Sequence, residues 1–332
     1  MELPEELWDA LEQALAGTSV KQLAAAVDRL IENYRGVPAT DRPVIRGALD
    51  VAAYAAYRMP ATFGAVRFAL AEFAALAGEW RPDSHVDVGG GTGSATWAVA
   101  QTWPSVQSSI VVDWAEPTRQ LGRQLAEHAA WPSVRGAQWT AQQIGTDTRL
   151  PEADLITMSY VLNELPAEAR SAIVAEMIAR GRVVVIVEPG TPEGYRRVIE
   201  ARTRLIEAGM SIVGPCPHDL TCPISLQDDW CHFATRINRS ATHRQIKGAS
   251  LSYEDEKFSY VIASRVPFPR AAGRVLRRPQ RGKKIVQFPV CSADGGVVRT
   301  TVTKSQGEAY RQAKDVAWGN AWPPVEPPAT QP

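Results

Sequence analysis

The first 80 residues carry apolar side chains at the spacing of one helical face. The clearest run consists of Leu23, Val27, Leu30, Ile31 and Tyr34. Alanine-rich stretches at 47–58 and 64–78 continue the pattern, and Pro60 separates them because proline interrupts a helix interior. The pattern predicts an N-terminal helical region over residues 1–80.

After residue 80 the pattern changes to short apolar runs rich in valine and isoleucine. These runs are HVDVG, SSIVVD, ADLITMS and RVVVIVEP, and segments of helical character near 94–102, 116–130, 166–180 and 192–208 separate them. Short buried strands that alternate with helices are typical of a parallel sheet. We therefore predict an α/β fold with a doubly wound, Rossmann-like sheet.

The last third of the chain has a third character. Residues 209–248 are irregular, residues 256–265 have the composition of a strand, and KKIVQFPV and VVRTTVTK flank the turn sequence SADGG. Two such runs around a glycine-containing turn predict a β-hairpin. The expected boundaries are a sheet core at 81–208 and 249–265, a cysteine-rich insertion at 209–248, a basic hairpin extension at 266–320 and a disordered tail at 321–332.

The composition is that of an ordinary globular protein, with 45% apolar and 22% charged residues over 332 positions. No run of about 18 apolar residues occurs, so a membrane span is not expected. The segment MELPEELWDALEQALAG is acidic and lacks the features of a secretory or mitochondrial targeting sequence. We expect a monomer in a bacterial-type cytoplasm, where thiols stay reduced.

The net charge is zero, but the charges are segregated. Residues 1–235 carry 19 Lys+Arg and 29 Asp+Glu, a balance of −10, whereas residues 236–304 carry 15 and 4, a balance of +11. A basic segment of this density favours a polyanionic partner such as RNA, with a solvated basic face as the alternative. The candidate RNA contacts are Arg236, Arg239, His243, Arg244, Lys247, Arg274, Arg277, Arg278, Arg281, Lys283 and Lys284, of which the run from 274 to 284 reads as a flexible basic loop.

A glycine loop follows the first predicted strand. The segment reads His85-Val86-Asp87-Val88 and continues Gly-Gly-Gly-Thr-Gly to residue 93, which gives the spacing D-x-G-x-G-x-G. Glycines permit positive φ angles and let the backbone approach a ligand closely. The spacing differs from the dinucleotide fingerprint G-x-G-x-x-G.

This loop resembles motif I of class I S-adenosylmethionine-dependent methyltransferases. The resemblance implies that Asp87, Gly89, Gly91 and Gly93 form the loop that holds the amino-acid end of the cofactor. It also implies that Asp113, 20 residues after Gly93, holds the ribose hydroxyls. Asn163 and Glu164 are weak catalytic candidates, because their alternative role is to cap the next helix. A Rossmann-like sheet that binds no cofactor is the alternative to the whole interpretation.

Four cysteines lie in the last third of the chain and none in the first 215 residues. Five residues separate Cys216 from Cys222, eight separate Cys222 from Cys231, and 59 separate Cys231 from Cys291. Clustered thiolates are ligands for soft metals and iron–sulfur centres. From the residues alone the alternatives are a [4Fe–4S] cluster, a structural zinc ion or four unrelated buried thiols.

Several segments together resemble the methyltransferase-like assembly factors of the small ribosomal subunit, the family of mitochondrial methyltransferase-like protein seventeen and its bacterial relatives. The matching segments are YRMPAT, VDVGGGTG, GPCPHDLTCP, DWCHF, HRQIKGASLSYEDEKFSYV and YRQAKDVAWGN, which span most of residues 50–320. The resemblance implies that the four cysteines ligate a [4Fe–4S] cluster. It also implies association with the small subunit and its rRNA.

Two functions remain open, of which this resemblance implies the first. The first is an rRNA-associated assembly factor that has a methyltransferase fold, an S-adenosylmethionine site and a [4Fe–4S] cluster. The second is an active methyltransferase that acts on RNA or a small molecule and has a structural zinc site. Whether the chain is an enzyme depends on which of the two holds.

Overall fold

The computed structural model describes residues 2–35, 47–224, 229–239, 244 and 251–325. The chain divides into two compact units. Unit 1 comprises Met1–Arg67, Arg81–Arg182 and Thr235–Glu256, and unit 2 comprises Phe68–Trp80, Val183–Ala234 and Lys257–Pro332. Residues 326–332 of the predicted disordered tail lie outside the described residues. Among the described helices, none is long and apolar enough to cross a membrane.

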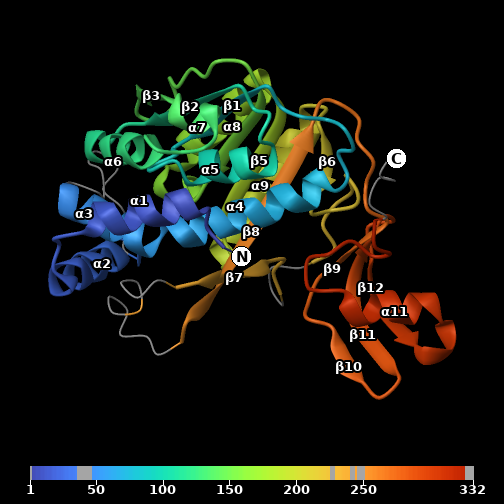
Figure 1. The fold of residues 1–332 in the computed structure, drawn as a ribbon. Helices are drawn as coiled ribbons and strands as arrows, with labels where there is room; N and C mark the ends of the chain where they lie inside the picture. The colour runs from blue at the N-terminus through green and yellow to red at the C-terminus, as the bar shows by residue number, and fades with distance from the viewer. Residues whose placement is uncertain (1, 36–46, 225–228, 240–243, 245–250, 326–332) are drawn as a thin grey trace. The chain divides into compact units, whose positions relative to one another are not determined.

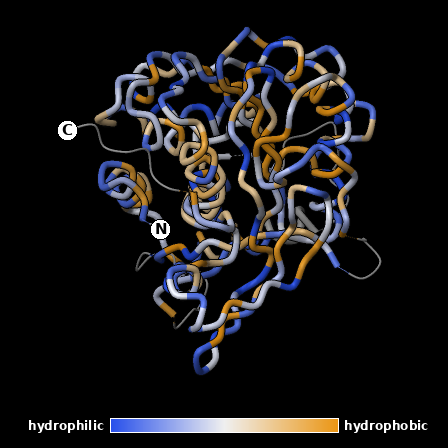
Figure 2. The backbone as a smooth tube through the Cα atoms, turned by 90° about the vertical axis from the view of Figure 1, so that its right-hand side faces the viewer, coloured by the Kyte–Doolittle hydropathy of each residue, from blue (hydrophilic) through white to orange (hydrophobic). Residues whose placement is uncertain are grey.

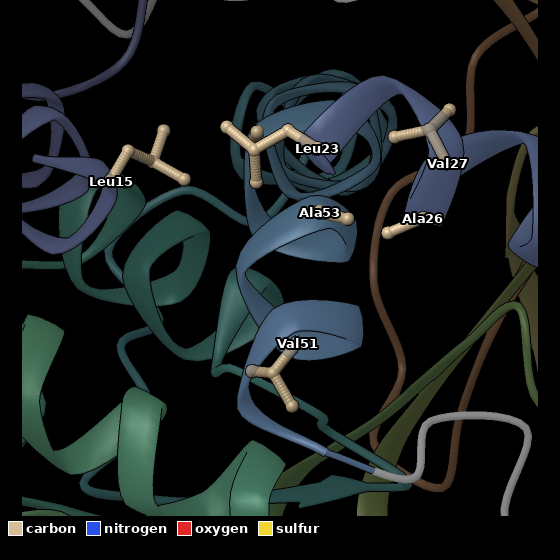
Figure 3. Packing of buried hydrophobic residues seen from close by; sticks show 7 residues of the cluster. Leu15, Leu23, Ala26, Val27, Val51 and Ala53 are labelled. Carbon is tan, nitrogen blue, oxygen red and sulfur yellow. The ribbon is translucent and has the colours of Figure 1, made fainter. Parts of the chain in front are cut away.

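Helices form the N-terminal region, as the periodicity predicts. They are α1 (Glu5–Leu15), α2 (Val20–Arg35), α3 (Ala48–Tyr57) and α4 (Met59–Ala74). Pro60 stands in the first turn of α4, where its missing N–H breaks no helical hydrogen bond. The apolar faces of α1, α2 and α3 meet in a cluster that includes Leu15, Leu23, Ala26, Val27, Val51 and Ala53 (Figure 3).

A parallel sheet forms the centre of unit 1. Its strands are β1 (Ser84–Val88), β2 (Ser108–Asp113), β3 (Gln138–Ala141) and β4 (Ala153–Ser159), in the order β3-β2-β1-β4 (Figure 1). The helices of this region are α5 (Ser94–Thr102), α6 (Glu116–Ala126), α7 (Pro132–Arg135) and α8 (Ala167–Arg180). Strand order reverses at β1, so right-handed crossovers place helices on both faces. The predicted doubly wound α/β core is confirmed.

In unit 2, antiparallel pairing replaces parallel pairing. β8 (Tyr253–Ser264) pairs antiparallel with both β5 (Gly181–Pro189) and β6 (Ser211–Gly214), and α9 (Pro192–Glu207) precedes β6. The remaining strand of this region, β7 (Phe233–Asn238), pairs with β8. The hydropathy colouring shows apolar strands in orange between hydrophilic connections in blue (Figure 2).

The predicted C-terminal hairpin is confirmed as part of a second sheet. β11 (Ile285–Ser292) pairs antiparallel with β12 (Val297–Thr303), and β9 (Gly273–Val275) and β10 (Gln280–Gly282) also pair with β11. The 3-10 turn η2 (Lys304–Gln306) and α11 (Glu308–Asp315) follow, and α11 lies beside β11 and β12 (Figure 1). The prediction of a flexible basic loop at 274–284 is wrong, because β9 and β10 there are hydrogen-bonded to β11.

The cluster between α2 and α3 yields a test of the helical packing. Leu23 is fully buried, so Leu23→Ala should lower the free energy of unfolding by about 2–5 kcal/mol through lost burial and a residual cavity. Val20 lies on the same helix and is 37% exposed, so Val20→Ala should change stability by less than about 0.5 kcal/mol. Urea unfolding followed by circular dichroism compares the two variants. Equal effects would contradict this packing.

Candidate cofactor site and cysteine centre

The glycine loop of residues 89–93 connects the end of β1 to α5. Gly89 has a φ of +63°, and a Cβ there would lie 2.4 Å from Cγ2 of Val161. A Cβ on Gly90 would lie 2.6 Å from Oδ2 of Asp87. The first position therefore needs glycine for its backbone conformation and for space, and the second needs it for space alone. The loop lies at the carboxyl end of β1, where the strand order reverses, which is the usual ligand position in such sheets.

Asp87 is fully buried within the sheet. Its Oδ1 accepts a hydrogen bond of 2.9 Å from the hydroxyl of Thr157, its partner residue on β4, and its Oδ2 accepts one of 3.3 Å from Thr96. Nε2 of His85 lies 2.8 Å from the Thr157 hydroxyl. Burial raises the pKa of Asp87 to about 7 and lowers that of His85 to about 3. Asp87 thus supports the glycine loop from within the sheet.

Asp113 ends β2, next to the loop. Its Oδ2 accepts a hydrogen bond of 3.1 Å from the Gly91 amide, and its Oδ1 accepts one of 2.9 Å from Ala115. Burial raises the pKa of the Asp113 carboxyl, and the two backbone donors act in the opposite direction. The structure therefore brings together the glycine loop and Asp113, the carboxylate to which the methyltransferase resemblance assigns the ribose hydroxyls.

The segment after β4 supplies the two weak catalytic candidates. Asn163 and Glu164 lie in the 3-10 turn η1 (Leu162–Glu164), and neither side chain caps that turn. Within the described part of the chain, Oδ1 of Asn163 is buried without a hydrogen-bond partner. A buried amide oxygen without a partner is energetically unfavourable, and a ligand that donates a hydrogen bond to it would remove this cost.

An ion-pair cluster next to the loop was missed by reasoning from the sequence. Arg58 follows α3, and its Nη2 lies 3.1 Å from Oε1 of Glu256. The Arg58 guanidinium carbon also lies 5.0 Å from the centroid of the Tyr160 ring. The available signal was the YRMPAT segment, which contains Arg58 and contributed only to the family resemblance.

The cysteine centre lies entirely in unit 2. Cys216, Cys222, Cys231 and Cys291 line one cavity with about 460 Å³ of space outside the protein atoms, partly open to solvent. Cys216 and Cys222 come from the segment after β6, Cys231 precedes β7, and β11 carries Cys291. The structure therefore brings all four predicted thiols to the same place.

Burial governs the electrostatics of these thiols. It raises the pKa of Cys216, of Cys231 and of Cys291, which reaches about 12. Repulsion between neighbouring thiolates adds to the increase, and Arg202 acts against it at Cys216 and Cys291. Without a bound cation these three thiols stay protonated at neutral pH, whereas a coordinated metal deprotonates its thiol ligands.

Of the residues that the structure describes, Tyr195 and His218 have side chains that lie close to cysteine sulfurs. The Tyr195 hydroxyl lies 3.0 Å from Sγ of Cys222, and Nε2 of His218 lies 3.5 Å from Sγ of Cys291. Among the described residues, no three Cys, His, Asp or Glu side chains are close enough together to hold a single metal ion.

The candidate RNA contacts divide by burial. Arg274 is 2% exposed and donates to the carbonyls of Pro215 and Gly319 beside the cysteine cavity, so its prediction as an RNA contact is wrong. Arg236 and Arg239 pair with Asp255 and Glu254. Among the other candidates, Arg277 is half-buried and pairs with Asp229, whereas the exposed ones are Arg244, Arg278, Arg281, Lys283 and Lys284.

Two of the candidate RNA contacts, His243 and Lys247, lie outside the described residues. A groove in unit 2 is lined by Arg277, Arg278 and Arg299. The sequence reasoning did not select Arg299, because this residue is separated in the chain from the dense run of charges. Its position on β12 brings it to the same groove.

The raised pKa of Asp87 predicts a specific pH dependence. Between about pH 4 and pH 7 the folded protein holds a proton that the unfolded chain has released, so stability falls as the pH rises through this range. Asp87→Asn removes that loss, and its stability relative to wild type should increase by on the order of 3 kcal/mol from pH 4 to pH 7. Urea unfolding at several pH values measures it.

The control for the Asp87 experiment is the same change at the exposed Asp147, which should leave the pH profile of wild type unaltered. Parallel profiles for Asp87→Asn and wild type would show that Asp87 does not hold a proton in the folded state.

A protein-family model described as mitochondrial small ribosomal subunit Rsm22 matches residues 48–323. Human mitochondrial ribosome assembly protein METTL17 is 28% identical over 302 residues, which cover 84% of this chain and 64% of that protein. The mitochondrial Rsm22-cox11 tandem protein 2 of Schizosaccharomyces pombe is 27% identical over 191 residues, which cover 43% of this chain and 25% of that protein. The chain thus spans less than two thirds of the length of both relatives.

Solved structures similar to the chain include methyltransferases. An O-methyltransferase family protein from Burkholderia thailandensis is 14% identical with a TM-score of 0.44, and the match covers 75% of this chain and 73% of that one. Magnesium protoporphyrin IX methyltransferase from Synechocystis is 15% identical with a TM-score of 0.36, and the match covers 59% and 76%. At these identities and scores, neither similarity bears on the function of the chain.

The comparisons correct one prediction and confirm another. The expected cytoplasmic location is wrong, because the family is described as mitochondrial and both curated relatives are mitochondrial proteins. Reduced thiols and an ordinary globular composition occur in both compartments, so composition did not discriminate between them. The family predicted from the sequence segments is confirmed: the match extends over most of the chain, which belongs to the mitochondrial small ribosomal subunit Rsm22 family.

Proposed function

We propose that this chain is an assembly factor of the small ribosomal subunit in mitochondria. Its sheet core would bind S-adenosylmethionine, and its cysteine centre would hold a [4Fe–4S] cluster. The observation that carries the proposal is the meeting of four cysteines, distant in the sequence, at one cavity of a chain that belongs to the Rsm22 family. The human relative is a mitochondrial ribosome assembly protein, which supports the same role.

The donor set suits an iron–sulfur cluster or a zinc ion. Four cysteines line one cavity, and four thiolates are a ligand set that both centres use. The resemblance of the cysteine segments GPCPHDLTCP and DWCHF to those of the family is what favours the cluster.

A cluster at this position would crosslink unit 2. It would join the segment after β6 to β11, because Cys216 and Cys291 are 75 positions apart. Closing so long a loop restricts the unfolded chain, and metal binding adds its free energy to folding. The cluster would also supply a redox centre, whose potential depends on hydrogen bonds to its sulfurs. Tyr195 and His218 are the side chains placed to make such bonds.

The glycine loop and its surroundings suit an adenosyl cofactor. Asp113 would accept the ribose hydroxyls, and the loop of residues 89–93 would lie against the amino-acid end. Asn163 offers a buried acceptor without a partner among the described residues. S-adenosylmethionine supplies an electrophilic methyl group when bound. Methyl transfer to rRNA is the second candidate function, and the position of Asn163 and Glu164 after β4 is the observation that favours it.

The basic sheet of unit 2 would contact rRNA. Its groove presents Arg277, Arg278 and Arg299, and the turn between β10 and β11 presents Lys283 and Lys284. Arginine and lysine bind phosphate by charge, so this contact would be salt-dependent and largely independent of sequence.

The cluster proposal predicts a coloured protein. Wild type purified without oxygen should contain about four irons and four sulfides per chain and show a broad band at about 400 nm that dithionite bleaches. Cys222→Ser should lose the band and most of the iron, because one thiolate ligand is gone. The neighbouring Thr221 is exposed, so Thr221→Ala is the matched control and should keep both. A colourless wild type with one zinc would refute the cluster.

The surface proposal predicts a change in salt dependence. Arg278→Gln combined with Lys283→Gln should weaken binding to a synthetic fragment of small-subunit rRNA and lower the slope of log affinity against log salt by roughly 1 to 2. Arg311 on α11 is exposed and pairs with Glu308, so Arg311→Gln is the control and should change the slope little. Fluorescence anisotropy at several salt concentrations measures the slopes. An unchanged slope in the double variant would exclude this surface.

A further inference from the structure

Arg58, Glu256 and Tyr160 form a closed set of contacts in unit 1. Nη2 and Nη1 of Arg58 lie 3.1 Å and 3.4 Å from the two carboxylate oxygens of Glu256. The Tyr160 hydroxyl donates to Oε1 of Glu256 at 2.8 Å, and its ring lies under the guanidinium. The guanidinium is therefore fixed in position by a bidentate ion pair and by an aromatic face.

The set lies against the glycine loop. The hydroxyl of Thr92, a loop residue, donates to Sδ of Met59, which directly follows Arg58. A Cβ on Gly91 would lie 3.9 Å from the hydroxyl of Tyr54, one helical turn before Arg58. The end of α3 therefore lies against the glycine loop of the proposed cofactor site.

The pKa of Tyr54 indicates which charged groups lie near the glycine loop. Burial raises the pKa of the Tyr54 phenol to about 12, Arg58 acts to lower it, and Glu164 and Asp113 act to raise it. The carboxylates of Glu164 and Asp113 therefore lie near Tyr54, and that of Glu256 lies beside Arg58. A further anion could enter these surroundings only beside a cation.

Arg58 is also accessible, and the backbone of Tyr160 beneath it is strained. Its side chain is 27% exposed, whereas that of Glu256 is 14% exposed. Tyr160 has a φ of +62°, which is unusual for a bulky side chain and costs on the order of 1 kcal/mol. The strained backbone directs the Tyr160 ring beneath the guanidinium and the hydroxyl toward Glu256.

We propose that Arg58 binds the carboxylate at the methionyl end of the cofactor, and that Glu256 and Tyr160 position its guanidinium for this contact. The inference rests on the proposed S-adenosylmethionine site. A guanidinium carries five N–H donors, and the pair with Glu256 uses two of them. Asp113 would fix the ribose, and Arg58 would fix the opposite end of the ligand across the loop.

The test compares two ligands that differ at the methionyl end. S-adenosylhomocysteine carries the carboxylate, and methylthioadenosine lacks the amino-acid group. Isothermal titration calorimetry of Arg58→Met should show a loss of affinity for S-adenosylhomocysteine of roughly tenfold to a hundredfold, the usual range for a charged hydrogen bond. Affinity for methylthioadenosine should stay within about twofold of wild type, because that ligand cannot reach Arg58 with an anion.

A second arm uses the wild-type protein and avoids any folding defect. Replacing the carboxylate of S-adenosylhomocysteine by a carboxamide should weaken binding to wild type by a similar factor and should not weaken binding to Arg58→Met further. The control variant Arg123→Met changes an exposed arginine of α6 that pairs with Glu116, and it should bind all three ligands as wild type does.

Each outcome has one meaning. Equal losses for both adenosyl ligands in Arg58→Met, or no loss for the carboxamide in wild type, would overturn the assignment while leaving the cofactor site in place. Failure of wild type to bind either adenosyl ligand would overturn the proposed cofactor site itself. Loss confined to the ligand that carries the carboxylate is the expected result.

Discussion

The parallel pairing of β1 with β2 and β4 is the constraint on which the cofactor site depends. Parallel strands end at the same edge of a sheet, so the loop after Val88, the carboxylate of Asp113 and the ring of Tyr160 meet there. The hydrogen bond from Thr157 to Asp87 joins two of these strands below the loop. A charged Asp87 would be costly at this depth, and its raised pKa records that cost.

The cysteine centre depends on a different constraint, the antiparallel sheet of unit 2. Pairing of β11 with β9 places Cys291 opposite Arg274, whose Nε donates to the carbonyl preceding Cys216. Four thiols line this cavity, and burial disfavours ionisation of three of them, Cys216, Cys231 and Cys291. A metal bound here, as proposed, would replace the protons of its thiol ligands.

Arginine has three different uses in this chain, and burial distinguishes them. Arg274 is enclosed and satisfies backbone carbonyls beside the cysteine cavity. Arg58 is partly exposed and held by a carboxylate and a ring. Arg278 is exposed on the basic sheet, where the proposed rRNA contact would lie. The guanidinium is chemically the same in each case, so only its surroundings assign its function.

The sequence by itself determined the elements and the family. Periodicity and valine-rich runs located the helices and strands, because burial of one helical face or of a strand leaves a local signature in the residues. Glycine spacing located the loop at residues 89–93, because Gly89, Gly91 and Gly93 have positive φ angles that favour glycine. The four cysteines were recognisable as a candidate metal site because they are confined to one region of the chain.

Only the tertiary structure decided which distant residues meet. It brought Glu256 to Arg58 across 198 positions and enclosed Arg274, which the charge pattern had assigned to the surface. It also ordered the basic run as strands, because pairing with β11 outweighs the low strand propensity of that segment. These outcomes depend on contacts between residues far apart in the chain, and no local pattern encodes them.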